Sequence, residues 1–596
     1  MEKENFDLRG LSLTRRDFLK GLAAAGLLGG SLGSGSTSLS STTKEVKSWL
    51  PEKWDKEADV VVIGAGFAGQ AAAIEADKLG ASVLMLEKAA EKYAGGNSRV
   101  CGQGFLSPSP AIWDDYSVYL KAVTAGLGFP CSDDPVEADK HIRSVYLEES
   151  SKNIKWFEDM GAVVAPYPGM FGSSGGWIPF YPHMPGADSV ASEPGCYRVT
   201  GDYAGSGGNW HFLDDYMRER GGIRIMYEAP AKRLVQNLPS KEVLGVVAVT
   251  GGREVERKDG GIDIVGGKEI YVKARKAVCV CAGGWEYNQQ MVRDFTGIPC
   301  NYSFGSPYNT GETIKMCWAA GADIRNMGTI SAPWMLSPGI LPPYKSALTM
   351  MPPPEGAFMI VGTNNKRFMD EFVQIFDYVG IRNKDKSGQE GAVNPSGTMV
   401  ENGVYVRVKY PMPMHMIFDE EARLSGPIFA PLIAGLAWAG QIEGYVPSPD
   451  NSAELAMGWM TRAATIGELV TKVGREPSPL FGKVPLEETV NGWNASCAAG
   501  KDLEQGRTKN LTPFTSGPFY AVELFPGCIN TQGGMMRNTK SQVIDIESKV
   551  IPRLYSAGEN GDIWTWIYQC MSNVGGGCYA YGRIAGQNAA AEKSWE

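Results

Sequence analysis

The chain of 596 residues contains no run of 18 or more apolar residues, so the sequence offers no obvious bilayer-spanning segment. Positive charge is also scarce. The 57 Lys and Arg residues are outnumbered by 66 Asp and Glu residues, and the formal net charge is −9. Because a general nucleic-acid binder is normally basic, we expect no nucleic-acid partner.

Cysteine motifs are missing as well. The 11 cysteines are scattered, with no C-x-x-C or C-x-x-C-H motif among them. This argues against covalent haem and weakens a zinc or iron–sulfur interpretation, so we expect no metal site. Buried free thiols are the favoured interpretation; a few disulfides or a cluster held by distant cysteines stay open. Cys279 and Cys281 alternate along a predicted strand and should face opposite sides.

The N-terminus carries an export pattern. Residues 14–30, TRRDFLKGLAAAGLLGG, contain Arg15 and Arg16, then an apolar segment rich in small residues. The pattern resembles a twin-arginine (Tat) signal. An amphipathic helix is the alternative, but four glycines would weaken it. We therefore predict a Tat signal and a disordered spacer over residues 1–50, export through the Tat translocase, and a periplasmic or extracytoplasmic location.

Residues 58–88, ADVVVIGAGFAGQAAAIEADKLGASVLMLEK, have the pattern of a strand, a helix and a second strand. Val60–Ile63 predicts the buried first strand. Three glycines follow in the spacing G-x-G-x-x-G, namely Gly64, Gly66 and Gly69. They suit a tight turn, the approach of a pyrophosphate and close helix–strand packing. The pyrophosphate would lie at the helix N-terminus, and Glu87 would accept a hydrogen bond from a ribose hydroxyl.

Further glycine-rich segments favour FAD over NAD. EKYAGGNSRVCGQGF follows the second strand, where a flavin site needs the chain to pass close to the ring and ribityl. IPRLYSAGENGD, residues 551–562, predicts a later strand, and NVGGGCYAYGRIAGQNAA opens a C-terminal helix. The predicted FAD contacts are Gly64, Gly66, Gly69, Glu87, Lys88, Gly95, Gly96, Asn97, Ser98, Gly283, Gly284, Gly558, Glu559, Gly575 and Gly576.

With these segments, the chain resembles the flavoprotein family of fumarate reductases and succinate dehydrogenases, which also contains the 3-ketosteroid dehydrogenases and urocanate reductase. The resemblance covers about residue 55 to the end. Other segments that carry it are 276–292, 309–327, 364–371, 517–524 and 531–545. It implies an α/β fold with a Rossmann-like FAD-binding domain of glutathione-reductase type, interrupted by an α+β capping domain. The predicted domains are FAD-binding residues 55–299, a cap at 300–505 and FAD-binding residues 506–596.

The sequence departs from the fumarate reductase branch at three positions. That branch donates a proton from an arginine in R-F-x-N-E-x-x-x-R-D, places a histidine before T-x-G-G, and clamps a carboxylate with the arginine of N-R-L-G-G. The corresponding residues here are Ile375, Asn530 and Asn573. A dicarboxylate would lose its bidentate partner, so fumarate is disfavoured as the substrate.

Candidate catalytic residues follow from the resemblance to 3-ketosteroid dehydrogenases, which use one tyrosine from each domain on an enone. Tyr378 in the cap and Tyr520 at the hinge resemble that arrangement, and a phenol with a pKa of about 10 can donate to a developing enolate. Both could instead be packing aromatics. Weaker candidates are Arg382, as an anion ligand, and His183, in the Gly- and Pro-rich residues 170–210. We predict a long loop there, either a binding element or a passive surface loop.

The expected protein is an exported FAD-dependent oxidoreductase that acts on CH–CH or C=C bonds. Reduction of an activated alkene, an enone or enoate, by hydride transfer from flavin N5 is the leading hypothesis. The sequence shows no second nucleotide-binding pattern for NAD(P)H, so we expect electrons from a membrane quinol or cytochrome partner. The alternatives are oxidation of a ketone by a 3-ketosteroid dehydrogenase-type enzyme and a non-catalytic electron-transfer flavoprotein.

Overall fold

The computed structural model describes residues 50–126, 136–167, 185–192, 195–298, 300–328, 330–331, 336–372, 398–401, 404–407, 410–431, 437–562 and 573–596. The predicted leader lies outside these ranges.

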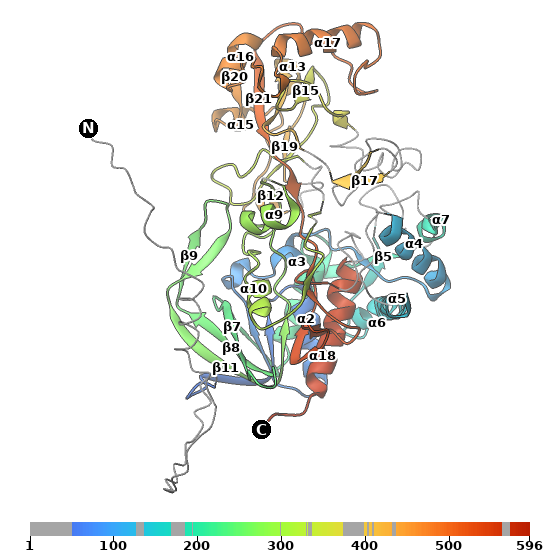
Figure 1. The fold of residues 1–596 in the computed structure, drawn as a ribbon, viewed down its shortest axis with the longest axis vertical. Coiled ribbons are helices and arrows are strands. Elements are labelled where there is room, and N and C mark those ends of the chain that lie inside the picture. Colours follow the sequence, from blue (N-terminus) through green and yellow to red (C-terminus); the bar gives the residue numbers. More distant parts are fainter. Residues whose placement is uncertain are drawn as a thin grey trace, which may run out of the picture. The chain divides into compact units, whose positions relative to one another are not determined.

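A central sheet holds together segments from both ends of the described chain (Figure 1). Its main path runs in the order β24 (Gln542–Ile544), β25 (Val550–Ser556), β11 (Lys268–Val280), β1 (Lys56–Ile63), β2 (Val83–Leu86) and β6 (Ile223–Met226). From β25 to β6 neighbouring strands are parallel, and Val60 lies opposite Val83. Strands of a covered parallel sheet are apolar throughout, and β2 is buried at every residue. This confirms the predicted α/β fold class.

Two helices that are far apart in sequence cover the sheet side by side, α2 (Phe67–Lys78) and α18 (Tyr581–Ala591) (Figure 1). Small residues allow their close approach. A Cβ atom on Gly582 would lie 2.7 Å from the Ala68 carbonyl oxygen, and one on Gly586 would lie 2.1 Å from the Ala72 carbonyl oxygen. The C-terminal helix therefore packs directly on the helix that follows the glycine-rich turn.

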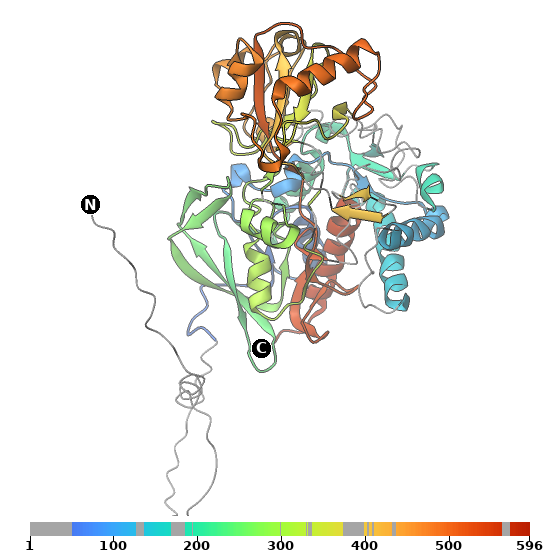
Figure 2. The ribbon, with the colours of Figure 1, turned by 45° about the horizontal axis from the view of Figure 1, so that its top comes forward.

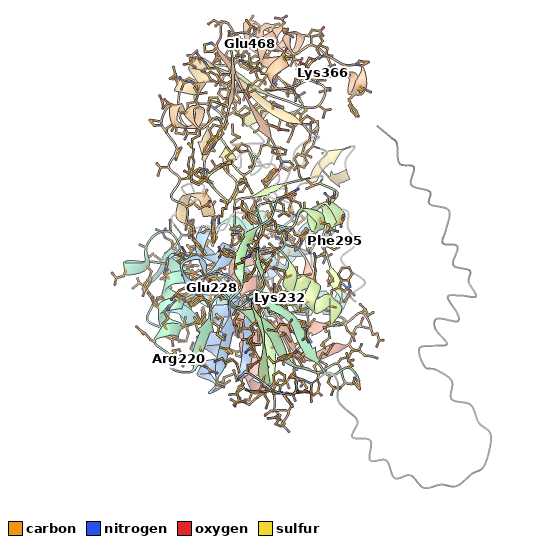
Figure 3. All side chains as sticks on the ribbon, turned by 90° about the vertical axis from the view of Figure 1, so that its left-hand side faces the viewer. Arg220, Glu228, Lys232, Phe295, Lys366 and Glu468 are labelled. Atoms are coloured by element: carbon orange, nitrogen blue, oxygen red, sulfur yellow. The ribbon has the colours of Figure 1, made fainter. Side chains whose placement is uncertain are left out.

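An accessory antiparallel layer extends from β11. Strand β8 (Val243–Thr250) pairs with β11 and with β7 (Ala231–Gln236). The hairpin of β9 (Arg253–Glu256) and β10 (Ile262–Val265) follows, and Lys232, labelled in Figure 3, donates from β7 to the Ile264 carbonyl at 3.3 Å. Helix α10 (Glu312–Ala319) packs against β7.

Further elements of the FAD-binding part lie between β2 and β6. They are α3 (Gly96–Val100), β3 (Phe105–Leu106), α4 (Trp113–Gly126), α5 (Val136–Ser151), α6 (Asn153–Glu158), β4 (Val164–Pro166), α7 (Ala187–Ser192), β5 (Cys196–Val199) and α8 (Gly208–Arg218). Elsewhere in the chain are α9 (Gln289–Thr296), β12 (Tyr302–Ser303), β13 (Ile324–Arg325), β14 (Thr349–Met350), β16 (Thr398–Glu401), β17 (Val404–Arg407), α13 (Glu420–Leu424), β19 (Phe429–Ala430), α14 (Trp438–Gln441), α15 (Ser452–Ala456), β22 (Gly527–Cys528), β23 (Gly534–Met536), β26 (Gly561–Asp562) and the π-helical η6 (Asn573–Ala580).

A second antiparallel sheet forms the core of the cap, in the order β15 (Phe358–Val361), β18 (Met414–Asp419), β21 (Phe519–Leu524) and β20 (Thr461–Ala463). Helices α16 (Ile466–Lys472) and α17 (Leu486–Ala498) lie beside it, in orange in Figure 2. Strand β21 pairs with both β18 and β20. The cap sheet therefore takes in residues beyond position 505, where the sequence places the return to the FAD-binding domain.

The cap contains a buried ionic cluster. Arg367 donates to both carboxylate oxygens of Glu371 at 2.8 Å and to those of Asp502 at 2.9 and 3.0 Å. Its guanidinium carbon lies 4.4 Å from the ring centroid of Trp493, and the three charged side chains are at most 1% exposed. Burial acts to raise the pKa of Asp502, but the hydrogen bonds from Arg367 hold that pKa well below its usual range.

Replacing Arg367 by Met should lower the free energy of unfolding by about 3–5 kcal/mol, because buried Asp502 loses its cation and Glu371 keeps only the longer contact with Arg507, at 3.4 Å. The adjacent Lys366 is exposed (Figure 3), so Lys366→Met is the matched control and should change stability by less than about 0.5 kcal/mol. Denaturant unfolding followed by tryptophan fluorescence measures both. Equal stability of the two variants would contradict the assigned role of the cluster.

Candidate active site

The turn between β1 and α2 is built on glycine. Gly64 has a φ of +98°, and a Cβ atom there would lie 2.5 Å from the Cys281 carbonyl oxygen of the strand-end next to it. A Cβ atom on Gly69 would lie 1.9 Å from the Gly64 carbonyl oxygen. The first turn of α2 thus rests directly on the turn before it. Gly66 is the N-cap residue of α2 and has an extended backbone. As a glycine, it has no side chain to cap the first N–H groups of the helix.

The second glycine-rich loop docks onto this turn. Ser98 Oγ accepts a hydrogen bond from the Phe67 N–H at 2.9 Å, at the N-terminus of α2. Gly95, at the start of the loop, has a φ of +109°. Asn97 accepts from the Ser306 N–H through Oδ1 at 2.8 Å, which fixes the orientation of its amide. The loop therefore connects the helix N-terminus to the segment that leads into α10.

Glu87 ends β2 beside the turn. Its Oε2 accepts from the Ala65 N–H at 2.9 Å and its Oε1 from the Ala89 N–H at 2.8 Å. Burial raises the pKa of Glu87, although these hydrogen bonds act in the opposite direction. A carboxylate has about four lone-pair sites, so each oxygen can still accept from a hydroxyl. Its role toward a ribose stays a prediction.

Lys88, the next residue, is engaged by the protein. Its Nζ pairs with Glu312 at 2.7 Å and donates to Thr310 Oγ1 at 2.8 Å. Burial lowers the pKa of Lys88, and the charge of Glu312 opposes that change.

A cavity of about 120 Å³ lies between the turn, the second loop and the C-terminal segments. The predicted cofactor residues that line it are Gly64, Gly66, Glu87, Lys88, Gly95, Gly96, Asn97, Ser98, Gly283, Gly558 and Glu559. Other predicted glycines do not line the cavity and pack closely against neighbouring atoms. A Cβ atom on Gly284 would lie 2.2 Å from Thr531 Oγ1, and one on Gly576 would lie 1.9 Å from the Tyr146 ring. Gly575 similarly faces the Leu106 backbone, at 2.3 Å.

Sequence reasoning missed one residue of this region, Glu286. Its side chain is 0% exposed and accepts from the amides of Asn97 and Asn309, each at 2.7 Å. The available signal was a lone acid in the apolar segment G-G-W-E-Y that follows β11. Asn97 also donates to Glu559, at 3.4 Å, so the two carboxyl groups share one amide.

Two amides, Asn530 and Asn573, lie where the resemblance to the fumarate reductase branch predicts a histidine and an arginine. Asn530 donates to Glu559, and its Oδ1 accepts from Gln532 at 3.2 Å. Asn573, at the start of η6, donates to Gln532 Oε1 at 3.3 Å and lines the cavity. A chain of neutral amides therefore runs from Glu559 to the cavity wall.

The structure does not bring Tyr520 to the cavity. Its ring is 1% exposed in β21, stacks on Phe418 with centroids 5.4 Å apart, and its hydroxyl donates to Glu420 at 2.5 Å. Burial and the neighbouring Glu420 raise the pKa of Tyr520, which makes it a poorer acid. It lies within the cap sheet, not at a hinge, because β21 pairs on both edges. Tyr378, Arg382 and His183 lie outside the described residues, as does Ile375.

Thiols also line the cavity, namely Cys101, Cys281 and Cys578. Cys279 lies on the same side of β11 as Cys281, in one buried cluster, because residues i and i+2 of a strand share a face. The expectation of opposite faces is therefore wrong. Cys279 Sγ lies 3.9 Å from the Ala585 carbonyl oxygen. Within the described ranges, we find no group of three or more His, Cys, Asp or Glu residues placed to hold a metal ion. None of the helices in these ranges is long and apolar enough for a membrane crossing.

A methyl group on Gly69 should disrupt the turn, because its Cβ would overlap the Gly64 carbonyl oxygen. We expect Gly69→Ala to lose most bound FAD and to lower the melting temperature. Gly221→Ala is the control, since a Cβ atom there meets nothing within 4 Å. The FAD content per chain, measured by flavin absorbance, and calorimetric melting provide the comparison. Wild-type FAD content in Gly69→Ala would contradict the packing role.

Similar proteins are oxidoreductases. The chain is 25% identical over 545 residues to the fumarate reductase (cytochrome) of Shewanella frigidimarina, covering 89% of this chain and 77% of that protein. It is 24% identical over 627 residues to the digoxin reductase of Eggerthella lenta, covering 98% of each. The solved structure of 3-ketosteroid Δ1-dehydrogenase from Sterolibacterium denitrificans has the same fold, with a TM-score of 0.61, 21% identity, and coverage of 90% of this chain and 100% of that chain.

A family model described as an FAD binding domain matches residues 59–576. The site fits that cofactor. At Gly64 and Gly69 a Cβ atom would overlap neighbouring backbone, a helix N-terminus faces the cavity, and an acidic residue ends β2. This chain therefore belongs to the FAD binding domain family, and it is an FAD-dependent oxidoreductase of the fumarate reductase and 3-ketosteroid dehydrogenase type.

Proposed function

We propose that this enzyme reduces the C=C bond of an activated alkene that is not a dicarboxylate. An enone is the class that suits the site best, and an enoate is the second. The reductive direction is supported by relatives that are named as reductases, among them the fumarate and digoxin reductases. FAD, when bound, supplies the hydride for one carbon of the alkene.

The observation that carries this proposal is the shortage of positive charge around the cavity. Lys88 is the single Lys or Arg among the described residues that line it, and that side chain is paired with Glu312. Asn530 and Asn573 stand where a histidine and an arginine would bind a carboxylate in the fumarate reductase branch. Neutral amides donate hydrogen bonds to a ketone oxygen, but they do not supply the charge-assisted bidentate pair that a carboxylate prefers.

Asn573 is the residue we expect to orient the substrate. An amide carries two N–H bonds, and one of those of Asn573 is directed at Gln532. The second is available for a carbonyl oxygen in the cavity. A hydrogen bond that strengthens as negative charge develops on that oxygen would stabilise the transition state. Because Gln532 is itself held by Asn530, the donor is fixed before the substrate binds.

We further propose that the electrons come from a membrane quinol or a cytochrome, and that the enzyme works on the extracytoplasmic side. The support is the twin-arginine pattern at Arg15 and Arg16, a single predicted nucleotide-binding turn, and a relative whose name includes a cytochrome. A folded, FAD-loaded protein suits the Tat route.

Dithionite-reduced enzyme should be reoxidised faster by an uncharged cyclic enone than by fumarate. We expect at least a tenfold difference in second-order rate constant, because one charge-assisted hydrogen bond is worth about 1.5–3 kcal/mol. Stopped-flow flavin absorbance gives the rates. Faster reoxidation by fumarate would refute the proposal. Reduction of the resting flavin by a saturated 3-ketosteroid, with no alkene active, would favour the dehydrogenase alternative.

Asn573→Asp should slow reoxidation by an anionic enoate more than by a neutral enone, since it places a negative charge at the cavity wall. We expect at least a tenfold change in the ratio of the two rates, as like-charge repulsion in a partly buried site is worth about 1–4 kcal/mol. Asn588→Asp, on α18 and bonded to the Ile584 carbonyl, is the matched exchange outside the cavity and should leave the ratio unchanged. An unchanged ratio in Asn573→Asp would contradict its contact with the substrate.

The leader makes a separate prediction. Replacing Arg15 and Arg16 together by Lys should keep FAD-loaded protein in the cytoplasm, because the translocase reads the arginine pair. Lys20→Arg keeps the charge of the same segment and should be exported normally. Immunoblots of periplasmic and cytoplasmic fractions measure the outcome. Export of the double-lysine variant would exclude this route.

A further inference from the structure

Two carboxyl groups lie together beside the cofactor cavity, and neither has a role in the proposed hydride transfer. Glu286 follows β11 and is 0% exposed, while Glu559 follows β25 and lines the cavity. Asn97 bridges them, with its Nδ2 2.7 Å from Glu286 Oε1 and 3.4 Å from Glu559 Oε2. Two segments that are far apart in the sequence thus place their carboxyl groups next to the same amide, that of Asn97.

The orientation of the bridging amide is fixed. Asn97 Oδ1 accepts from the Ser306 N–H at 2.8 Å, so its Nδ2 must face the carboxyl groups. Asn309 gives Glu286 Oε1 a second donor at 2.7 Å, and the Thr531 hydroxyl lies 3.3 Å from Glu286 Oε2. On the other side, Asn530 donates to Glu559 Oε1.

These partners are all neutral. Among the described residues, neither Glu286 nor Glu559 forms an ion pair with a Lys or Arg. Lys88, the one Lys or Arg among the described residues that line the cavity, is already paired with Glu312. Two buried carboxylates without a cation repel each other strongly, so one of the two is held in its protonated form.

The hydrogen bonds decide which carboxyl keeps the proton. Glu286 accepts two amide donors at 2.7 Å and faces a hydroxyl, which favours its anionic form. Glu559 has a single close donor, Asn530, and a weaker one at 3.4 Å. Burial and then the charge of Glu286 raise the pKa of Glu559 to about 8.

The other titratable groups around the pair do not change their protonation state near neutral pH. Burial raises the pKa of each neighbouring thiol or phenol, which keeps it neutral; these groups are Cys528, Cys578 and Tyr287. The cation on this side is Arg537, whose guanidinium donates to the carbonyls of Ser556 at 3.1 Å and Gly558 at 3.4 Å. Arg537 therefore holds the backbone that presents Glu559, without pairing with its carboxyl.

We propose that Glu286 and Glu559 form a carboxyl pair that stores the proton of the reductive reaction. Glu559 releases its proton into the cavity as the hydride leaves for the alkene, and the O–H bond that breaks supplies the new C–H bond on the adjacent carbon. Glu559 then takes a proton from solvent when the next two electrons arrive, so hydride plus proton completes the saturation of C=C. Glu286 is a positioning residue that sets the proton affinity of Glu559. The delivery to carbon rests on the proposed function; the storage of a redox-linked proton rests only on the bound cofactor.

The first test uses FAD-free protein, so it does not depend on activity. Infrared titration of the wild type should show a protonated carboxyl C=O band that disappears near pH 8. Glu559→Gln should lack the band. Glu286→Gln should shift its midpoint down by about one pH unit or more, a tenfold loss of proton affinity, because the repelling charge is gone. A purely structural Glu286 would leave the midpoint in place.

The second test measures the flavin midpoint potential against pH without any alkene. Above about pH 8, reduction of the wild type should bind one additional proton per two electrons, which steepens the slope by about 30 mV per pH unit. The slope of Glu559→Gln should not steepen. Glu454→Gln, a buried acid of the cap that accepts from Tyr445 at 2.9 Å, is the matched control and should behave as wild type.

The outcomes separate this inference from the proposed function. Absence of a carboxyl that titrates within about one unit of pH 8 in wild-type protein overturns the stored proton even if a variant fails to bind FAD. An identical slope in wild type and Glu559→Gln overturns the redox link. Both tests can give the expected results while no alkene is reduced. In that case the proton-storing role of the carboxyl pair is supported and only the proposed substrate class is rejected.

Discussion

The close approach of the β1–α2 turn to the end of β11 is the constraint on which the rest of the site depends. Gly64 lies where a Cβ atom would be 2.5 Å from the Cys281 carbonyl oxygen, and Gly69 leaves no room above Gly64. These contacts allow the N-terminus of α2 to face the cavity with its free N–H groups, the arrangement that favours a pyrophosphate. Glu87, the Ser98 loop and the Glu286 segment then take their positions from the same three elements, β1, β2 and β11.

Completion of the site by the distant C-terminus explains why the cap can be inserted without disrupting the cofactor fold. Strand β25 joins β11 in parallel and ends at Gly558 and Glu559 on the cavity wall. Helix α18 then packs on α2 through glycines that admit its backbone. The chain between β11 and β25 can therefore extend into the cap and return, because the parallel pairing of the two strands holds both ends of that segment in one sheet.

Local chemistry made part of this structure predictable. The βαβ pattern predicts β1, α2 and β2, because apolar strands and glycine spacing are dictated by neighbours in sequence. The pairing of Glu286 with Glu559 could not be predicted in that way, since it depends on the register between β11 and β25. Tyr520 illustrates the same limit. Its sequence neighbourhood suggests a hinge, but pairing with β18 and β20 places the ring in the cap sheet. The glycine-rich start of the C-terminal helix predicts cofactor contacts for Gly575 and Gly576, but not the close packing of these residues on the Leu106 backbone and the Tyr146 ring.

The polar character of the cavity wall links substrate choice to proton handling. Replacing cationic side chains by Asn530 and Asn573 removes the attraction for a dicarboxylate, and it also removes the charges that would hold Glu559 ionised. In a site with a strong arginine clamp, a nearby carboxyl would lose its proton and could not act as an acid at neutral pH. With amides in place, burial and repulsion from Glu286 keep a proton on Glu559. On the proposed function, the same neutral amides that disfavour fumarate would leave Glu559 as the acid in place of the arginine expected at Ile375.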